Sequence, residues 1–397
     1  MKFIDIIKND EVVWDKVNTI PEFSILNETM QSQKWHKEGD VMKHTRNVVD
    51  IIKREISKEN YLKRLLFISA ALCHDIGKGT TTKWDKEKND YTSLNHGLAG
   101  EKIVRKLFFD EETFVREEVC YMVRWHMTLH HLLDKEDIEE QKKILVRLSH
   151  GLMSIKDMAL LTMCDSKGSI SDSENDETIN RKYKRIMELA KELDCFDKSY
   201  KFKNDYEKLY FFNCGKKRFC DSFPPSLDKY GKNKPFVVTI MIGVAGSGKD
   251  TYVSKFLSEQ VMLCRDNIRT EIGLKGDKPF GNPRQEKKVT EIFNQRLIEC
   301  CNNKQNVVLN NTNLVKKYRN DFLRMILPYH PYVQYVYIEP PKMDDCIIRR
   351  KGQIDKKIIN GMWDRLEFPD LTECNLLYVY KEYSDERGNE TGLNYIF

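Results

Sequence analysis

Histidines and aspartates that suit a metal centre are concentrated in the first part of the chain. Eight of the nine histidines lie between residues 36 and 150. His74 and Asp75 are adjacent and follow the strongly apolar segment 65–72. Neutral imidazole and carboxylate are suitable ligands for Mn²⁺, Co²⁺, Ni²⁺ or Zn²⁺, so these residue types predict a transition-metal site. A buried helix that ends in two polar side chains also needs a partner for them, because unpaired polar groups are costly to bury.

A different chemistry is indicated near the middle of the chain. The β-rich apolar run 236–242 leads directly into a glycine-rich segment, and a helix is expected from Thr251 onward. In this context backbone N–H groups and the helix N-terminus bind phosphate, and the lysine contacts the β- and γ-phosphates of ATP or another NTP. The residues expected to bind the nucleotide are Gly243, Ala245, Gly246, Ser247, Gly248, Lys249, Asp250 and Thr251.

One position of this loop departs from the common pattern. Asp250 follows the lysine where serine or threonine is usual, and Thr251 comes after it. The sequence therefore leaves open whether Thr251, Asp250 through a water molecule, or neither contacts Mg²⁺.

Two kinds of hydrophobic pattern predict a multidomain chain. In residues 1–195 the apolar residues recur at helical spacing, which predicts an all-α domain. In residues 235–397 short apolar segments, such as 236–242 and 333–338, alternate with helical stretches, which predicts an α/β domain with a parallel sheet. Residues 196–234 are expected to connect the two domains, and their aromatic content indicates that part of this connection packs.

The composition favours an ordinary soluble protein. The chain is 40% hydrophobic and 32% charged, and no stretch approaches the ~18 apolar residues of a membrane helix. The first residues lack the pattern of a secretory signal. Eleven cysteines without a Cys-x-x-Cys pair predict free thiols and a cytoplasmic location. A net charge of only +5 means that a polynucleotide would have to be held by a local patch.

Five segments of the N-terminal half resemble, in the same order, those of the HD phosphohydrolase superfamily. They are WHKEGDVMKHT, ALCHDIGKGT, NHGLAGEKIV, VRWHMTLHH and LLTMCDSKGS, within about residues 30–195. The resemblance implies that Asp75 bridges two metal ions, which would activate water and stabilise the leaving oxygen. The implied ligands are His44, His74, Asp75 and Asp165 for one ion, with His96 and His126 added for the second.

Two further residues are expected to contact the substrate of this site. Lys78 follows Asp75 by about one helical turn and is expected to contact the phosphate. His130 lies four residues after His126 on the same helix face, so it is also expected to reach the site.

After the phosphate-binding loop, the segment LCRDNIR resembles the phage-type polynucleotide 5′-kinases. By this likeness Asp266 is the general base for a 5′-hydroxyl, because a carboxylate accepts the proton as phosphoryl transfer proceeds. Arg269 would hold a substrate phosphate, a role that suits a planar guanidinium. The alternative interpretation of these two residues is a surface ion pair.

Two later segments bear on the same resemblance. Asn311 occupies a position where kinases of this type carry an acidic residue, which weakens any claim that a carboxylate from this strand holds Mg²⁺. The segment IIRRKG resembles a lid that closes over ATP. From it Arg350 or Arg349 is expected to stabilise charge on the transferring phosphoryl group.

Both halves together resemble the bifunctional HD-domain polynucleotide kinases, which heal broken nucleic-acid ends. The resemblance implies phosphorylation of 5′-OH ends with ATP or another NTP and Mg²⁺. It also implies removal of 2′,3′-cyclic, 2′- or 3′-phosphate from RNA or DNA ends with a transition metal. These are the ends that a ligase, as a downstream partner, needs repaired.

Two other functions stay open on the sequence. One is a small-molecule nucleoside or nucleotide kinase fused to an HD nucleotidase, since the Gly-Lys-Asp-Thr loop also occurs in nucleotide kinases. The other is a nucleotide-switched binding module whose HD domain is catalytically silent. An end-healing kinase should use an oligonucleotide far better than a nucleoside, which separates the first of these from end healing.

Overall fold

A computed structural model describes residues 1–172, 175–225, 236–274, 282–384 and 390–396. The chain divides into two compact units, Met1–Lys201 and Phe202–Phe397. Residues 226–234 of the expected connection lie outside the described residues. Among the described residues, no helix combines the length and the apolar character that crossing a bilayer requires.

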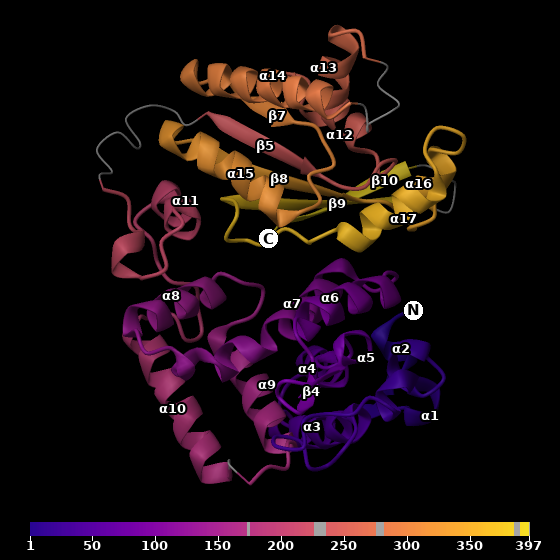
Figure 1. Cartoon of the computed structure of the whole chain (residues 1–397), viewed down its shortest axis with the longest axis vertical. Helices are drawn as coiled ribbons and strands as arrows, with labels where there is room; N and C mark the ends of the chain where they lie inside the picture. Colours follow the sequence, from indigo (N-terminus) through magenta and orange to yellow (C-terminus); the bar gives the residue numbers. More distant parts are fainter. Residues whose placement is uncertain (173–174, 226–235, 275–281, 385–389, 397) are drawn as a thin grey trace. The chain divides into compact units, whose positions relative to one another are not determined.

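The first unit is predominantly helical, as the helical spacing predicted (Figure 1). Its helices are α1 (Trp14–Val17), α2 (Pro21–Ser24), α3 (Val41–Glu55), α4 (Tyr61–Cys73), α5 (Lys78–Thr81), α6 (His96–Leu107), α7 (Thr113–His130), α8 (Ile138–Ser149), α9 (Ile155–Gly168) and α10 (Asp176–Glu192). Short 3₁₀ turns occur at η1 (Phe3–Asp5), η2 (Ile25–Asn27) and η3 (Leu132–Asp134).

Helix α4 lies at the centre of this unit. Every residue from Leu65 to Cys73 is buried, and the helix packs against α3, α7 and α9. Burial of each large apolar side chain contributes about 1.5–3 kcal/mol, which offsets the cost of burying polar groups nearby. Because the helix ends at Cys73, the next two residues, His74 and Asp75, emerge inside the unit rather than at its surface.

Two small hairpins, which the helical patterns did not predict, interrupt the helices. Strand β1 (Ile7–Lys8) pairs with β2 (Glu11–Val12), and β3 (Lys83–Asp85) pairs with β4 (Asp90–Thr92). Strands of two or three residues are too short to show an alternating pattern. The second hairpin is held by its turn, where Asp85 accepts two backbone N–H groups at 3.0 and 3.2 Å, and by the ring of Trp84 against Tyr91.

The second unit is an α/β domain around one six-stranded sheet with the order β10-β9-β8-β5-β7-β6. The five strands from β9 to β6 are parallel, and β10 is antiparallel to β9 at one edge. The strands are β5 (Val237–Ile242), β6 (Val261–Leu263), β7 (Val307–Leu309), β8 (Tyr332–Glu339), β9 (Leu376–Ser384) and β10 (Glu390–Ile396). The parallel sheet predicted from the apolar segments is confirmed, whereas the antiparallel edge strand was not predicted.

Helices flank this sheet (Figure 1). They are α11 (Asp205–Asn213), α12 (Lys249–Phe256), α13 (Arg265–Glu271), α14 (Pro283–Asn302), α15 (Lys316–Ile326), α16 (Asp345–Arg349) and α17 (Lys356–Arg365), with η4 (Cys220–Ser222) and η5 (Leu327–Tyr329). Val253 and Leu257, in and just after α12, pack with Met241 and Val336 of the sheet. Because β5 is paired on both sides, the loop that follows it starts from a fixed position at the carboxyl edge of the sheet.

Helix α11, in the first part of the expected connection, packs within the second unit. The ring of Tyr206 stacks on His330 with 4.1 Å between centroids, and the Asn213 side chain donates to the carbonyl of Thr372 at 3.0 Å. The aromatic residues after 202 are therefore structural rather than a free linker.

A buried arginine holds the segment that follows β7. Arg319 is fully buried and forms two hydrogen bonds with the carboxylate of Glu373, at 2.8 and 3.1 Å. Its Nη1 also donates to the backbone carbonyls of Asn313, Leu314 and Glu367 at 3.0–3.1 Å. This side chain thus links α15 to the loop beside the phosphate-binding segment.

We expect Arg319→Met to destabilise the second unit by about 3–5 kcal/mol, because it leaves the buried Glu373 carboxylate, among the described residues, with Lys316 at 3.5 Å as its remaining counter-charge. Hydrogen exchange of the β7 and β8 amides measures this loss locally. Arg324→Met on the same helix is the matched control, since that side chain is 65% exposed. Equal protection of the β7 and β8 amides from hydrogen exchange in the two variants would contradict the prediction.

Candidate metal centre and phosphate-binding loop

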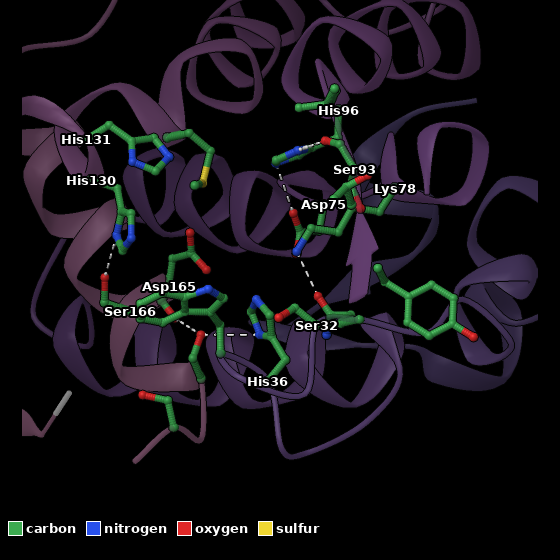
Figure 2. Close-up of a pocket in the computed structure, with 18 of the residues that line it drawn as sticks. Ser32, His36, Asp75, Lys78, Ser93, His96, His130, His131, Asp165 and Ser166 are labelled. Carbon is green, nitrogen blue, oxygen red and sulfur yellow. Dashed lines mark hydrogen bonds and ion pairs between the residues drawn. The ribbon is translucent and has the colours of Figure 1, made fainter. Parts of the chain in front are cut away.

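Six predicted metal ligands meet in the interior of the first unit. His44 comes from α3, His126 from α7 and Asp165 from α9, while His96 begins α6. His74 and Asp75 directly follow α4. Figure 2 shows the side chains of Asp75, His96 and Asp165 around the cavity beside this centre. The structure therefore brings together all six residues that were predicted from separate segments.

One group of ligands gathers around the Oδ2 atom of Asp75. His44 Nε2 lies 3.8 Å from this oxygen and 2.9 Å from Asp165 Oδ1. His74 Nε2 lies 3.4 Å from Asp75 Oδ2 and 3.5 Å from Asp165 Oδ1. Two imidazole nitrogens and two carboxylate oxygens are thus close enough to share one ion.

The other oxygen of Asp75 faces a second pair of histidines. Oδ1 lies 3.4 Å from His96 Nε2 and 3.8 Å from His126 Nε2, and these two nitrogens are 3.1 Å apart. Asp75 is therefore the one carboxylate that both ligand groups contact among the described residues.

Backbone carbonyls set the direction of three of these rings. With Nδ1 protonated, each ring donates to a carbonyl 2.8 Å away and turns Nε2 toward the centre. The pairs are His74 with Ala71, His96 with Ser93, and His126 with Val123. In each pair the acceptor lies three residues before the histidine, so the local chain fixes the tautomer.

The chemistry of this ligand set fits a transition metal. Burial and the neighbouring His96 lower the pKa of His126 to about 3, so its imidazole is neutral and able to act as a ligand. Burial would raise the pKa of the Asp75 carboxyl, but Lys78 and His74 hold that pKa well below its usual range. In the part of the chain that the structure describes, the buried Nε2 of His74 has no hydrogen-bond partner. An ion would satisfy this nitrogen.

Lys78 lies directly beside the centre. Its Nζ is 2.7 Å from Asp75 Oδ2 and donates to the side-chain oxygen of Gln31 at 2.7 Å. The ammonium is thus anchored at the wall of the cavity, where the sequence placed a contact to phosphate. Gln31 was not identified from the sequence.

Glu38 is a second residue that sequence reasoning missed. Its side chain is 4% exposed, and Oε1 lies 2.8 Å from Nδ1 of His36 and 3.0 Å from Nδ1 of His44. Its other oxygen accepts the backbone N–H of Ile170 at 2.9 Å. Glu38 therefore places a carboxylate within ion-pair distance of the ring nitrogen of His44 that faces away from Asp165.

A cavity of about 460 Å³ opens from the metal centre. His130 lines it, with its Nδ1 3.3 Å from the Ser166 hydroxyl (Figure 2), and among the described residues it belongs to none of the groups that could hold an ion. His36 and His131 also line the cavity. The structure thus places His130 where it can contact a ligand and keeps it out of the metal centre.

We expect Gly77→Ala to lower metal-dependent phosphohydrolysis at this centre strongly. A Cβ atom on Gly77 would lie 2.0 Å from the carbonyl oxygen of His96 and 2.6 Å from the backbone nitrogen of Gly100, so α6 must move away. Displacing His96 by about 1 Å is expected to lower the rate roughly 100-fold. Hydrolysis of a phosphomonoester with Mn²⁺ measures the effect. Gly361→Ala, where a Cβ meets nothing within 4 Å, is the control, and full activity of Gly77→Ala would contradict the prediction.

The glycine-rich loop of the second unit has the backbone conformation that a phosphate site needs. Gly246 and Gly248 have φ values of +84° and +105°, which disfavour any residue with a side chain. Nζ of Lys249 donates to the carbonyls of Gly243 and Val244 at 3.0 and 2.9 Å, and burial lowers the pKa of this amine to about 8.

A cavity of about 260 Å³ lies over this loop. It is lined by Gly246, Gly248, Lys249, Asp250, Thr251, Arg349 and Arg350. Each of these residues was predicted to contact the nucleotide or to come from the lid. Of the remaining predicted loop residues, Ser247 is fully buried, Gly243 directly follows β5, and Ala245 lies in the turn.

Asp250 contacts the neighbouring strand end and the lid segment. Its Oδ1 accepts a hydrogen bond from the side chain of Asn310 at 2.7 Å, and its Oδ2 lies 3.7 Å from Nη2 of Arg350. Asn311 occupies the position where the resembling kinases carry an acidic residue. Its side-chain oxygen instead accepts the backbone N–H of Arg265 at 3.0 Å. Asn310 is therefore the residue of this strand end that faces the loop, and sequence reasoning missed it.

Asp266 and Arg269 form the ion pair that the sequence left as an alternative. Arg269 donates to Asp266 and also binds both oxygens of Glu286 at 2.8 and 2.9 Å. The Asp266 side chain is 71% exposed, whereas Arg269 is buried. Neither residue lines the cavity over the loop. A substrate phosphate would have to compete with two carboxylates for Arg269.

Comparison with known families divides the chain in the same way. Residues 41–149 match the HD domain family, and residues 238–353 match an AAA domain family. The chain therefore carries an HD domain followed by a P-loop kinase-like domain, which confirms the two domain types predicted from the sequence. No curated protein matches the chain.

Two solved structures show limited similarity. One is titled "Structure of the Pnkp1/Rnl/Hen1 RNA repair complex"; it is 20% identical, and the match covers 35% of this chain and 46% of that chain, with a TM-score of 0.31. The other, "Structure of Pnkp1/Rnl/Hen1 complex", is also 20% identical and covers 32% and 44%, with a TM-score of 0.28. The chain thus matches less than half the length of either solved chain.

Proposed function

We propose that this chain, which joins an HD domain to a P-loop kinase-like domain, is a bifunctional enzyme that heals nucleic-acid ends. The P-loop domain would phosphorylate 5′-OH ends, and the HD domain would remove 2′,3′-cyclic, 2′- or 3′-phosphate from RNA or DNA. The observation that carries the proposal is the position of Asp75 between two sets of buried ligands, in a chain whose other unit holds a phosphate-binding loop.

In the HD domain, His44, His74, Asp75 and Asp165 would hold one metal ion, and Asp75, His96 and His126 a second. Bound there, the ions would supply a deprotonated water and stabilise the leaving oxygen. The protein's own contribution includes Lys78, whose ammonium is anchored by Gln31 at the cavity wall. This charge is expected to bind a non-bridging oxygen of the substrate phosphate and to help align it.

In the P-loop domain, backbone N–H groups of residues 243–249 would bind the phosphates of ATP or another NTP, and Mg²⁺ would neutralise their charge. Lys249 would exchange its two carbonyl partners for phosphate oxygens. Arg350, beside Asp250, would stabilise the charge that develops on the transferring group. Asp266 is exposed and is proposed to take the proton of the 5′-hydroxyl as that oxygen attacks.

The competing function is a small-molecule kinase fused to a nucleotidase. The observation that favours it is Arg269, which is occupied by Glu286 and Asp266 rather than open to a polymer phosphate. The two cavities, of about 260 and 460 Å³, are also of a size that small ligands fill.

One substrate tests both activities and both functions. The purified chain is incubated with ATP, Mg²⁺ and Mn²⁺ or Ni²⁺, and with a 5′-OH oligonucleotide that ends in a 2′,3′-cyclic phosphate. Mass spectrometry of each end is expected to show phosphate gained at the 5′ end and lost at the 3′ end, which are the ends a ligase joins. Transfer to free nucleosides with the oligonucleotide unchanged would contradict end healing and support the competing function.

A further inference from the structure

The cavity of the HD domain is larger than a phosphate group requires. At about 460 Å³ it lies within the range of ~300–1,000 Å³ that is typical of sites for drug-sized ligands. Lys78 and the metal ligands occupy only one part of its lining. The rest of the cavity therefore has room for a part of the substrate beyond its phosphate group.

Two apolar side chains of this lining are exposed to solvent. Trp35 is 43% exposed and Leu94 is 65% exposed, and both line the cavity that holds Asp75 and Lys78. Exposed apolar groups in a cavity bind an apolar ligand surface, because burial removes both surfaces from water.

Hydrogen bonds link the two chain segments that carry these side chains. The hydroxyl of Ser32 donates to Asp90, the first residue of strand β4. This hydrogen bond connects β4 to the turn in which Trp35 lies. At the other end of β4, the hydroxyl of Ser93, the residue before Leu94, lies 2.7 Å from the hydroxyl of Thr82. The apolar part of the cavity is therefore built from two segments that hydrogen bonds tie together.

Positive charge accompanies the apolar surface. The ammonium of Lys34 lies 4.7 Å from the centre of the Trp35 ring, and Lys182 of α10 lines the same cavity. A ligand with a flat aromatic part and more than one phosphate fits an indole ring in a cavity with nearby ammonium groups better than a purely apolar ligand does. A polynucleotide end has this composition.

We propose that the HD cavity binds the terminal nucleoside of an unpaired end, with its base stacked on Trp35 and bordered by Leu94. This inference rests on the proposed function and specifies its substrate. The terminal phosphate lies at the metal centre, and the next phosphate along the strand faces Lys34 or Lys182. We expect unpaired ends to be preferred, because a paired terminal base would bring its partner base with it into a cavity of about 460 Å³.

The test uses two oligonucleotides with a 3′-phosphate that differ only in the last nucleoside, which carries a base in one and is abasic in the other. With Mn²⁺, we expect the protein to hydrolyse the first with at least 5-fold higher kcat/KM. Trp35→Ala is expected to lower kcat/KM for the base-bearing substrate by about 5- to 100-fold and to leave the abasic substrate unchanged. Tyr61→Ala, which removes an aromatic ring that is 55% exposed and does not line the cavity, is the matched control.

A binding measurement supplies a readout that does not depend on catalysis. A terminal 2-aminopurine should lose fluorescence on binding to the metal-free protein, and Trp35→Ala should keep the fluorescence high. Equal hydrolysis of both oligonucleotides by the unaltered protein, or an equal loss on both substrates in Trp35→Ala, would overturn the inference while end healing stands. Hydrolysis of mononucleotides but of neither oligonucleotide would instead overturn the proposed function.

Discussion

Asp75→Asn is expected to lower phosphohydrolysis by at least about 1,000-fold and to leave the kinase activity unchanged. The carboxylate is the residue that both ligand groups share, so its replacement removes one ligand from each position. A metal centre contributes several kcal/mol of transition-state stabilisation, and each 1.4 kcal/mol is a factor of ten in rate. The amide also removes the counter-charge of Lys78, which lies 2.7 Å from Oδ2.

The measurement follows both ends of one oligonucleotide in the same reaction. Asp50→Asn on α3 is the control, because it changes an exposed aspartate of the same unit in the same way. Circular dichroism and metal analysis of the purified variant separate loss of the ion from loss of the fold. Phosphohydrolysis at the normal rate with bound metal would show that Asp75 does not hold the catalytic ions.

The second large effect is expected from Lys249→Ala, which should lower kinase activity about 100- to 1,000-fold and spare phosphohydrolysis. Removal of one hydrogen-bond donor that stabilises the developing charge in the transition state typically lowers kcat by about this factor. Without nucleotide, the lysine donates to the backbone carbonyls of Gly243 and Val244, which are neutral, and the neighbouring Asp250 keeps Arg350 at 3.7 Å. The loop is therefore expected to keep its fold.

Lys255→Ala on the same helix is the matched control, since Lys255 is exposed. The 5′-phosphate gained per minute at saturating ATP measures the catalytic loss, and nucleotide binding is measured separately. If either Asp75→Asn or Lys249→Ala removes both activities from a folded chain, the assignment of one reaction to each unit is wrong.

The candidate metal ligands could be named from the sequence because each lies in a short local pattern. His74 and Asp75 follow an unbroken apolar run, and that run predicted a buried helix ending at them. The distances among the ligands depend on how α3, α7 and α9 pack around this helix, which no local pattern contains. Glu38 was missed for the same reason, since its importance arises from contacts with His44 and with the backbone of Ile170.

In the second unit, the sequence predicted the central strands better than the edges. Val237–Ile242 is apolar except at Thr239 because the strand is buried from Val238 onward, and this gave a clear signal. The contact of Asn310 with Asp250 depends on chain segments distant in sequence. Strand β10 lies at the edge of the sheet, where it pairs with the preceding strand β9. The emphasis on Asn311 came from alignment to a family pattern, which cannot tell which of two adjacent asparagines faces the loop.

The two oxygens of Asp75 have a thermodynamic consequence for the proposed pair of ions. Because one carboxylate serves both positions, occupancy of either position changes the affinity of the other, and linkage requires the two effects to be equal. The stepwise dissociation constants are then properties of the pair and not of either position. A histidine that contacts only one ion, such as His126, would consequently influence the affinity of an ion it never touches.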